Sequence, residues 1–162
     1  MGIPPARLHL RDIRSEDFEA LHRLDQLCFE PGIAYSRQEL LAFLELPTRE
    51  GVVAEVGESA ERKLAGFAVG ALADRRIGRV ITLDVAPHLR RRGTGRALLE
   101  ELLSRLSRAG ARRAILEVDA GNTGAIAFYR RFGFRSRRRI PNYYAPGRTA
   151  LEMEASLVSL IA

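Results

Sequence analysis

Apolar residues follow two different periods along the chain, and these periods separate expected helices from expected strands. Between residues 93 and 109, leucines and alanines recur every three to four positions, which predicts an amphipathic helix. Ile81, Leu83 and Val85 lie two residues apart, which predicts a strand with these side chains on one face. The same criteria predict helices at 15–28, 37–46 and 122–132, and strands at 8–14, 52–56, 64–73, 79–86, 114–118, 134–140 and 150–157.

The order of these elements indicates the fold class. Antiparallel strands precede residue 87 and a strand–helix–strand unit follows, so we expect an α+β fold with a central mixed, mostly antiparallel sheet. This sheet would have about six to seven strands and about four flanking helices. Leu27 and Leu41 are expected to face the core with the other leucines of the first two helices. The apolar run at 114–118 predicts a strand that is buried on both faces.

Length and composition are those of one soluble domain. The chain has 162 residues, of which 46% are hydrophobic and 28% are charged, and neither a repeat nor a linker divides it. We therefore expect a single domain over residues 1–162. The longest mostly apolar run, 64–73, is about half the ~20 residues that a membrane helix needs, and no apolar signal core opens the chain. A cytoplasmic protein is expected.

Cysteine and histidine usage indicates neither a disulfide nor a metal site. Cys28 is the only cysteine, and no histidine or cysteine cluster has the spacing of metal ligands. Cys28 lies close to Leu24, Leu27 and Phe29, which favours a small core residue over a nucleophile. We expect no metal and assign no chemistry to Cys28.

The charge of the chain raises the alternative of a nucleic-acid-binding protein. The net charge is +6 and the isoelectric point is about 10.4. In this alternative, Arg130, Arg131 and the arginines at 137–139 would form the binding surface. However, arginines are spread along the whole chain, acidic residues interleave with them, and no platform of stacking aromatic residues accompanies them. The charge pattern alone therefore does not favour this function.

The most informative stretch spans residues 81–95 and reads ITLDVAPHLRRRGTG. Pro87 removes a backbone donor and ends the strand, and Gly93 and Gly95 open the helix that follows. The first turn of that helix offers N–H groups without helical partners, and the helix dipole favours an anion there. The flanking arginines are Arg90, Arg91, Arg92 and Arg96. The stretch predicts a phosphate site, and the alternative is a glycine-rich turn beside solvated charges.

Two better-known phosphate-binding loops do not fit this stretch. A P-loop needs GxxxxGK[ST], but the only lysine of the chain is Lys63. A Rossmann loop needs its glycines directly at the strand end and a third small residue where Leu98 stands. The spacing of Arg90, Gly93 and Gly95 instead resembles the [RQ]xxGx[GA] pyrophosphate-binding loop of the GNAT family of N-acetyltransferases.

The resemblance continues beyond the loop. Residues 116–134, LEVDAGNTGAIAFYRRFGF, are similar to the next strand and helix of the family, and residues 142–153 are most similar to bacterial ribosomal-protein alanine N-acetyltransferases. The similarity covers roughly the last half of the chain, whereas the first half agrees only in the order of its elements. The chain departs from that subfamily at Thr149, where an acidic residue is usual, and at 27–36, which lacks the usual aromatic and acidic run. Both departures lie where a substrate is expected.

The resemblance implies acetyl-CoA as the cosubstrate. The backbone of Leu83, Asp84 and Val85 would pair with pantetheine and hold the acetyl carbonyl. Asn122 would lie against the cofactor and could also cap its helix. The pyrophosphate would be bound by Arg90, Arg91, Arg92, Gly93, Thr94, Gly95 and Arg96.

Glu117 and Tyr129 are the candidate catalytic residues. On its apolar strand, Glu117 is either an ion-paired structural acid or a carboxylate held in a cleft to accept a proton. The family has its general base at the position of Glu117. Tyr129 would by default be a core aromatic residue, but the family has at this position the acid that protonates the CoA thiolate. The resemblance thus implies general acid–base catalysis by these two residues.

The acceptor is expected to be a primary amine. Near neutral pH an α-amine, with a pKa of about 8, is neutral far more often than a lysine side chain, with a pKa of about 10.4. No second acid beside Glu117 is evident from the sequence, so we expect the N-terminal α-amine of a protein as the acceptor. The alternative is a small amine such as a polyamine or an antibiotic. The enzyme is expected to be a monomer or a homodimer.

Overall fold

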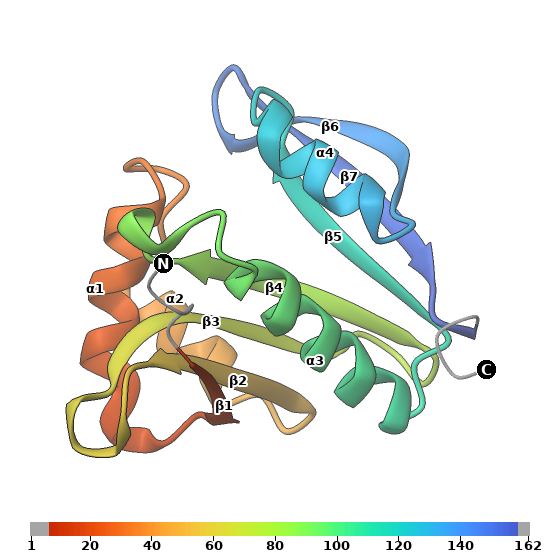
Figure 1. Ribbon diagram of the computed structural model, residues 1–162. Coiled ribbons are helices and arrows are strands. Elements are labelled where there is room, and N and C mark those ends of the chain that lie inside the picture. Colours follow the sequence, from red (N-terminus) through yellow and green to blue (C-terminus); the bar gives the residue numbers. More distant parts are fainter. Residues whose placement is uncertain (1–6, 159–162) are drawn as a thin grey trace. The chain divides into compact units, whose positions relative to one another are not determined.

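Seven β-strands hydrogen-bond in the order β1-β2-β3-β4-β5-β7-β6 (Figure 1). The computed structural model describes residues 7–158. The strands are β1 (Leu8–Asp12), β2 (Arg49–Val56), β3 (Lys63–Leu72), β4 (Ile77–Val85), β5 (Arg113–Asp119), β6 (Arg135–Ala145) and β7 (Arg148–Ser156). The helices are α1 (Phe18–Cys28), α2 (Arg37–Leu44), α3 (Thr94–Arg108) and α4 (Thr123–Arg131). This mixed sheet with its helices confirms the predicted α+β fold.

The chain forms two compact units. Among the described residues, the N-terminal unit contains 7–69 together with 82–102, and the C-terminal unit contains 70–81 and 103–158. Both β4 and α3 contribute residues to each unit. Organisation as a single domain over residues 1–162 stays a prediction.

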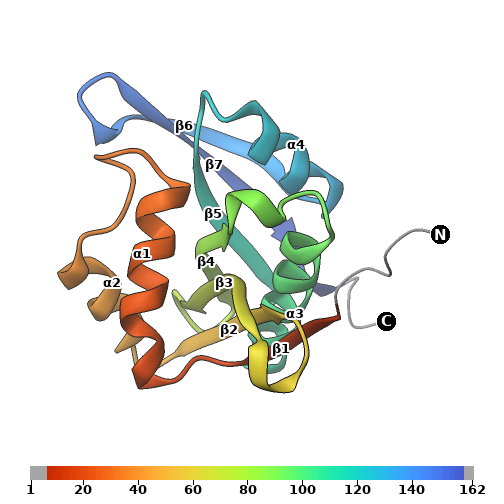
Figure 2. The same cartoon turned by 60° about the vertical axis from the view of Figure 1, so that its left-hand side comes forward.

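Two helices of the N-terminal unit, α1 and α2, lie side by side in both ribbon views (Figure 1, Figure 2). α1 follows a 3-10 turn at Ser15–Asp17, and this turn occupies the start of the helix predicted at 15–28. α2 begins after Ser36, whose hydroxyl accepts a hydrogen bond from the Glu39 amide in a capping box. α2 ends at Leu44 and is therefore shorter than the predicted 37–46.

The inward faces of these helices are narrower than the apolar pattern predicted. Leu21 and Leu24 are buried, but Leu27 is 72% exposed and Leu41 is 44% exposed. The prediction that Leu27 and Leu41 face the core was wrong. The inward stripe of α1 instead passes through the polar residue Asp25, which follows Leu24 and is fully buried.

One face of β4 is more enclosed than the other, and the enclosed face carries polar side chains. Val80, Thr82 and Asp84 are buried, whereas Leu83 and Val85 on the opposite face are only half-buried. The alternation of apolar residues therefore predicted the strand and the shared face. It did not predict which face is enclosed, because that depends on the elements that cover the strand.

The C-terminal unit is built around β5. This strand pairs in parallel with the start of β4, from Ile77 to Arg79, and antiparallel with β7 along its length. α4 lies beside β6 and β7 in both ribbon views (Figure 1, Figure 2). β6 reaches Ala145, beyond the predicted end at residue 140, with a register shift after Ile140. An irregularity of this kind accommodates Pro141 within a strand.

The prediction that β5 is buried on both faces was wrong. Ala114, Leu116 and Val118 are buried, while the alternate positions are half-buried. Charged side chains occupy three of these alternate positions and form ion pairs. These pairs are Arg113 with Glu154, Glu117 with Arg79 and Asp119 with Arg148. Partial exposure therefore lowers the desolvation cost of these charges.

The contact between β3 and β4 in the N-terminal unit requires a glycine. A Cβ atom added at Gly66 would lie 2.4 Å from the carbonyl oxygen of Asp84, a backbone atom, and 3.0 Å from Leu98 Cδ1. No side chain fits at that separation, so β3 can approach the end of β4 this closely only because residue 66 lacks a side chain.

We predict that Gly66→Ala destabilises the protein by about 1–3 kcal/mol, because the new methyl group must displace backbone. The matched control is Gly124→Ala in α4, where an added Cβ would meet only Asn122 Oδ1 at 4.0 Å. That control should stabilise the helix by up to about 1 kcal/mol. Chemical denaturation of both variants measures the two effects, and equal stabilities would contradict the proposed steric constraint.

Candidate active site

A tight turn follows β4 in the N-terminal unit and leads into α3. The strand ends at Val85, Pro87 begins a 3-10 turn, and the Arg90 Nε donates back to the Val85 carbonyl at 3.2 Å. The chain then passes through two positive φ angles, 64° at Arg91 and 84° at Gly93. α3 begins at Thr94, as predicted to within a residue. The positive φ explains the glycine at position 93.

The start of α3 has the properties of a phosphate-binding site. The first helical bond of this turn runs from the Ala97 amide to the Gly93 carbonyl, so the amides of Thr94, Gly95 and Arg96 precede the bonded ladder. A Cβ added at Gly93 would meet no atom within 4 Å, which leaves the space beside its backbone open to a ligand. Arg91 and Arg92 are exposed beside this turn, and Arg96 is exposed and pairs with Glu100. These groups fit the pyrophosphate of CoA.

Leu83, Asp84 and Val85 can serve a ligand mainly through their backbone. The Asp84 side chain is fully buried, so it faces away from any ligand on the surface of β4. The Val85 carbonyl already accepts from Arg90 Nε and, at 3.3 Å, from the thiol of Cys28. These contacts hold the end of β4 in a defined position.

Cys28 is a half-buried thiol that donates to the Val85 carbonyl. Burial and the nearby Asp84 carboxyl raise the pKa of its thiol to about 11. The thiol is therefore protonated at neutral pH, and the absence of a chemical role for Cys28 stays a prediction.

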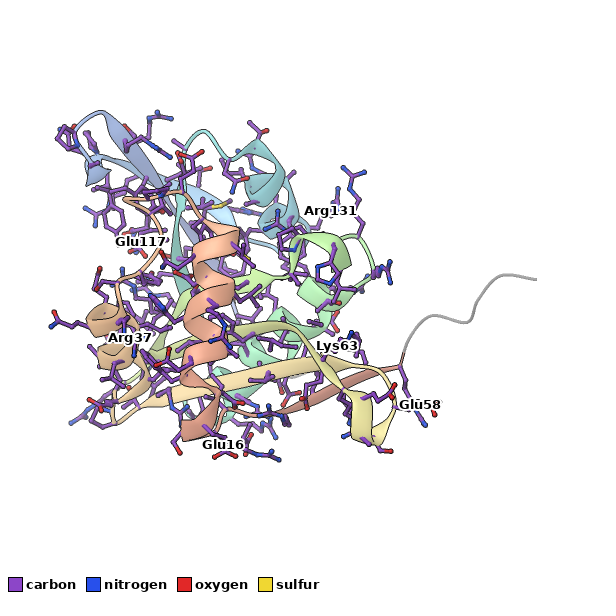
Figure 3. The ribbon with its side chains drawn as sticks, turned by 90° about the vertical axis from the view of Figure 1, so that its left-hand side faces the viewer. Glu16, Arg37, Glu58, Lys63, Glu117 and Arg131 are labelled. Atoms are coloured by element: carbon purple, nitrogen blue, oxygen red, sulfur yellow. The ribbon has the colours of Figure 1, made fainter. Side chains whose placement is uncertain are left out.

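Glu117 in the C-terminal unit lies on β5 and is labelled in Figure 3. Its Oε2 accepts from Arg79 Nη2 at 2.9 Å, and the same Arg79 nitrogen donates to the Tyr143 hydroxyl at 2.9 Å. Burial raises the pKa of Glu117 above its ordinary value, and the positive charge of Arg79 opposes this rise. Glu117 therefore has features of both predicted alternatives. It forms an ion pair, and its carboxyl binds a proton more readily than an ordinary glutamate.

A second acid lies directly beside Glu117, contrary to the prediction. Glu152 on β7 is the cross-strand partner of Glu117 and is 5% exposed. Its negative charge contributes to the raised pKa of Glu117. Arg138 binds Glu152 through two nitrogens, each at 3.2 Å, and Arg137 lies 3.6 Å from it. The sequence could not show this neighbour, because the register of β7 against β5 sets the pairing.

Tyr129 lies on α4 in an aromatic cluster of the C-terminal unit. Its ring is edge-on to those of Phe128 and Phe134, with centroids 5.4 and 5.8 Å apart. Burial raises the pKa of the Tyr144 phenol far above its ordinary value of 10.0. Electrostatic interactions with Glu117 and with an ionised Tyr129 raise this pKa further. Tyr144 therefore lies within electrostatic reach of both candidate catalytic residues.

Asn122 is the N-cap of α4, as the sequence predicted. Its Oδ1 accepts from the Ala125 amide at 3.1 Å. The side chain is exposed, and its role toward the cofactor stays a prediction.

Sequence reasoning did not identify Arg79, Glu152 and Tyr143 as parts of the site. Arg79 gave one usable signal, because a charge at this position breaks the apolar pattern of the β4 strand. The residues of the alternative nucleic-acid surface are partly engaged in ion pairs. Arg137 pairs with Glu154 at 3.0 Å, and Arg138 pairs with Glu152.

The described residues form neither a metal-binding cluster nor a membrane-spanning helix. Residues 7–158 contain no group of three or more histidine, cysteine, aspartate or glutamate side chains that could hold a metal ion. Within the same residues, no helix has the length and apolar character needed to cross a membrane.

The chain is similar to known acetyltransferases in sequence and in fold. The model of the "Acetyltransferase (GNAT) family" matches residues 12–134. Ard1 from Thermoplasma volcanium is 29% identical, with a TM-score of 0.81, covering 92% of this chain and 97% of that chain. The ribosomal-protein-S18-alanine N-acetyltransferase from Escherichia coli is 24% identical, with a TM-score of 0.79, covering 93% and 94%. The spermidine/spermine N-acetyltransferase from Vibrio cholerae is 18% identical, with a TM-score of 0.72, covering 95% of each chain. No curated protein sequence matches significantly.

We predict that two substitutions move the pKa of Glu117 in opposite directions. Arg79→Gln removes the cation that stabilises the carboxylate, so the pKa should rise. Glu152→Gln removes a like charge, so the pKa should fall. Carbon-13 NMR titration of labelled glutamate carboxyls measures both shifts. Arg113→Gln, which breaks a pair with Glu154, is the control, and shifts of the same sign in the first two variants would contradict the described electrostatics.

Proposed function

The chain belongs to the GNAT acetyltransferase family, whose members are acyltransferases that use acetyl-CoA, and we propose that it acetylates the N-terminal α-amine of a protein. The amine nitrogen attacks the thioester carbonyl, a carbon–nitrogen bond forms, and the carbon–sulfur bond to CoA breaks. The amine loses one proton and the CoA thiolate gains one. The protein must therefore supply a base, an acid and a binding site that aligns the two substrates.

The proposal is carried by the environment of Glu117. Its side chain is 10% exposed and burial raises its pKa, so at neutral pH it can accept a proton more readily than an exposed glutamate. Arg79 keeps the carboxylate oriented, and it links Glu117 to Tyr143. We assign Glu117 as the base that takes the proton of the amine. Tyr129 is assigned as the acid that returns a proton to the thiolate.

The acceptor follows from proton affinity and from charge. Glu152 is a second acid beside Glu117, but Arg137 and Arg138 pair with it, which leaves Glu117 as the carboxyl for proton transfer. A single weak base handles an α-amine more easily than a lysine amine, because the α-amine loses its proton about two pH units lower. Arginines balance both acids, so the site has no excess of negative charge to attract a polyamine or an aminoglycoside.

The similar structures include enzymes named for both classes of acceptor. One is named for a ribosomal-protein alanine and another for spermidine and spermine. At 24% and 18% identity these likenesses concern the fold alone. The resemblance of residues 142–153 to the ribosomal-protein enzymes supports the protein N-terminus as the acceptor. Localisation in the cytoplasm belongs to the same proposal.

The proposed CoA site gives the first prediction for this function. Gly93→Glu puts a side chain and a negative charge into the space beside the start of α3, so CoA affinity should fall at least about tenfold. The control is Gly133→Glu, because Gly133 also has a positive φ, 88°, and open space around its Cβ position. Isothermal titration with CoA measures both variants. If the Gly93 variant binds as tightly as wild type, the assignment of this turn to the pyrophosphate is wrong.

The acid–base roles are tested with an active acceptor. Peptides that begin with Ala, Ser or Met are screened beside polyamines and aminoglycosides, and preference for a peptide is expected. Glu117→Gln should then lower kcat/KM about 10²- to 10⁴-fold and remove the acidic limb of its pH profile. Tyr129→Phe should lower kcat with CoA affinity nearly unchanged, because phenylalanine keeps the edge-on ring contacts.

Tyr144→Phe is the matched control for the acid. This variant removes a phenol near the same residues but keeps Tyr129, the proposed acid. Its effect on kcat should therefore be smaller than that of Tyr129→Phe. A larger effect would transfer the role of the acid to Tyr144. If Glu117→Gln and Tyr129→Phe both stay within about threefold of wild-type activity between about pH 6 and pH 9, the acid–base assignment is wrong. Positioning of the two substrates would then be the source of catalysis.

A further inference from the structure

Two buried carboxyl groups in the N-terminal unit have no role in the proposed chemistry. Asp25 lies on α1 and Asp84 on β4, and both residues are 0% exposed. The two carboxyls lie close enough that each shifts the pKa of the other. Two carboxylates in such an enclosed place repel each other and lose their hydration, unless a proton neutralises one of them.

Each carboxyl uses one oxygen to accept from a donor outside the pair. The Thr82 hydroxyl donates to Asp84 Oδ1, and the Tyr35 amide donates to Asp25 Oδ2 at 2.7 Å. The other two oxygens, Asp25 Oδ1 and Asp84 Oδ2, are buried and have no donor among residues 7–158. Buried polar atoms without a partner are rare in folded proteins. The two oxygens therefore require an explanation.

We propose that Asp84 Oδ2 carries a proton and donates it to Asp25 Oδ1, and that this bond fixes Tyr35 and the segment 29–36 to the end of β4. A single proton satisfies both oxygens. The pair then carries one negative charge instead of two. Asp25 and Asp84 are positioning residues in this proposal, because neither side chain contacts a substrate.

The charges around the pair are consistent with one bound proton. Burial raises the pKa of Asp84 well above its ordinary value of 3.8, and contact with Asp25 raises it further. Burial also raises the pKa of Asp25, whereas contact with Asp84 and the Tyr35 amide lower it. Burial and contact with the partner act in the same direction at Asp84, so we place the proton on Asp84. The other titratable groups that face the pair are His22 and Cys28 of α1, Glu39 of α2 and Arg90 of the turn after β4.

Asp25 connects this proton to Tyr35 in the segment 29–36. Two residues of α1 hydrogen-bond to the backbone of Tyr35. The Tyr35 amide donates to Asp25, and the Tyr35 carbonyl accepts from Gln26 Nε2 at 2.7 Å. The Tyr35 ring also contacts that of Phe43 edge-on, with centroids 4.9 Å apart. A change at Asp84 is therefore transmitted through Asp25 to Tyr35. Asp84 itself stands between Leu83 and Val85, whose backbone is proposed to hold pantetheine.

Loss of the proton should loosen this connection. In the unfolded chain both carboxyls ionise near pH 4, whereas the folded pair keeps its proton to higher pH. The folded state then binds more protons than the unfolded state, so the stability contributed by the pair is lost as pH rises through the raised pKa of Asp84. Above that pKa two buried carboxylates face each other, and the segment 29–36 is released from β4.

The first test compares thermal stability over pH. Asp84→Asn replaces the acidic proton with an amide hydrogen that does not titrate. The Tm of this variant should therefore rise relative to wild type by roughly 3 °C or more between about pH 5 and pH 10. Asp25→Asn should behave in the same way, and it serves if the first variant does not fold. Asp74→Asn, at an exposed turn, is the control and should follow the wild-type profile.

The double variant gives a sharper test. In Asp25→Asn with Asp84→Asn, each amide oxygen must face outward to accept from Tyr35 or Thr82, so the two NH₂ groups face each other. The double variant should be less stable than the sum of the two single effects at about pH 6. Additive effects in the double variant, or parallel pH profiles of wild type and the single variants, would overturn the shared proton.

The effect of Asp84 on catalysis rests on the proposed acetyl transfer. The shared proton itself does not depend on that function. With an active acceptor, the ratio of the acceptor KM of wild type to that of Asp84→Asn is measured at each pH, which cancels ionisation of the amine and of Glu117. This ratio should rise at least about threefold from pH 7 to pH 10. A constant ratio beside the expected stability profile would overturn the positioning role alone. Failure to find any acceptor would count against the proposed function and would leave the stability tests intact.

Discussion

The carboxyl group of Asp84 is fully buried, and the geometry at the end of β4 depends on how the N-terminal unit accommodates it. Thr82 donates to one oxygen and the nearby Asp25 carboxyl raises the pKa of Asp84, while Gly66 lets β3 pass within reach of the Asp84 backbone. The adjacent Val85 carbonyl is held by Cys28 and Arg90. Hydrogen bonds to a buried group are directional, so this arrangement leaves the strand end little freedom. The turn that leads to the anion site at α3 therefore starts from a fixed point.

Burial has the same first effect on Glu117 as on Asp84, but the compensation differs. Both carboxyls have a raised pKa because they lose hydration. The Glu117 side chain is 10% exposed and has the permanent cation Arg79 at 2.9 Å, which favours its carboxylate form. Asp84 has a second acid as its neighbour, which favours the protonated form. One group is therefore suited to proton exchange with a substrate, and the other is suited to holding a proton within the fold.

The family resemblance fixes the donor side of the reaction more firmly than the acceptor side. The turn between β4 and α3 uses backbone amides, a positive φ and arginines, and these features depend on local sequence. The proposed acceptor side instead involves Arg79, Glu152 and Tyr143, which come from three different strands. Arg79 contacts Glu117 and links it to Tyr143, and Glu152 lies opposite Glu117 because β7 pairs with β5. Enzymes of one fold can therefore share a cosubstrate and differ in the amine that they accept.

Most of the fold could be predicted from the sequence, because period, proline, glycine and capping residues act over a few neighbouring positions. The strand at Ile81, the turn after Pro87, the N-cap Asn122 and the helix that begins beside Gly93 are all of this kind. The exposure of Leu27 and Leu41, the enclosed polar face of β4 and the half-exposed alternate face of β5 could not be predicted, since each depends on what covers the element. The neighbours of Glu117 could not be predicted from the sequence for the same reason. Sequence by itself determined the family, and it predicted the candidate base and the candidate anion site. Only the tertiary structure decided which charges surround Glu117 and that the carboxyls of Asp25 and Asp84 are buried near each other. Burial and strand register depend on residues far apart in the chain.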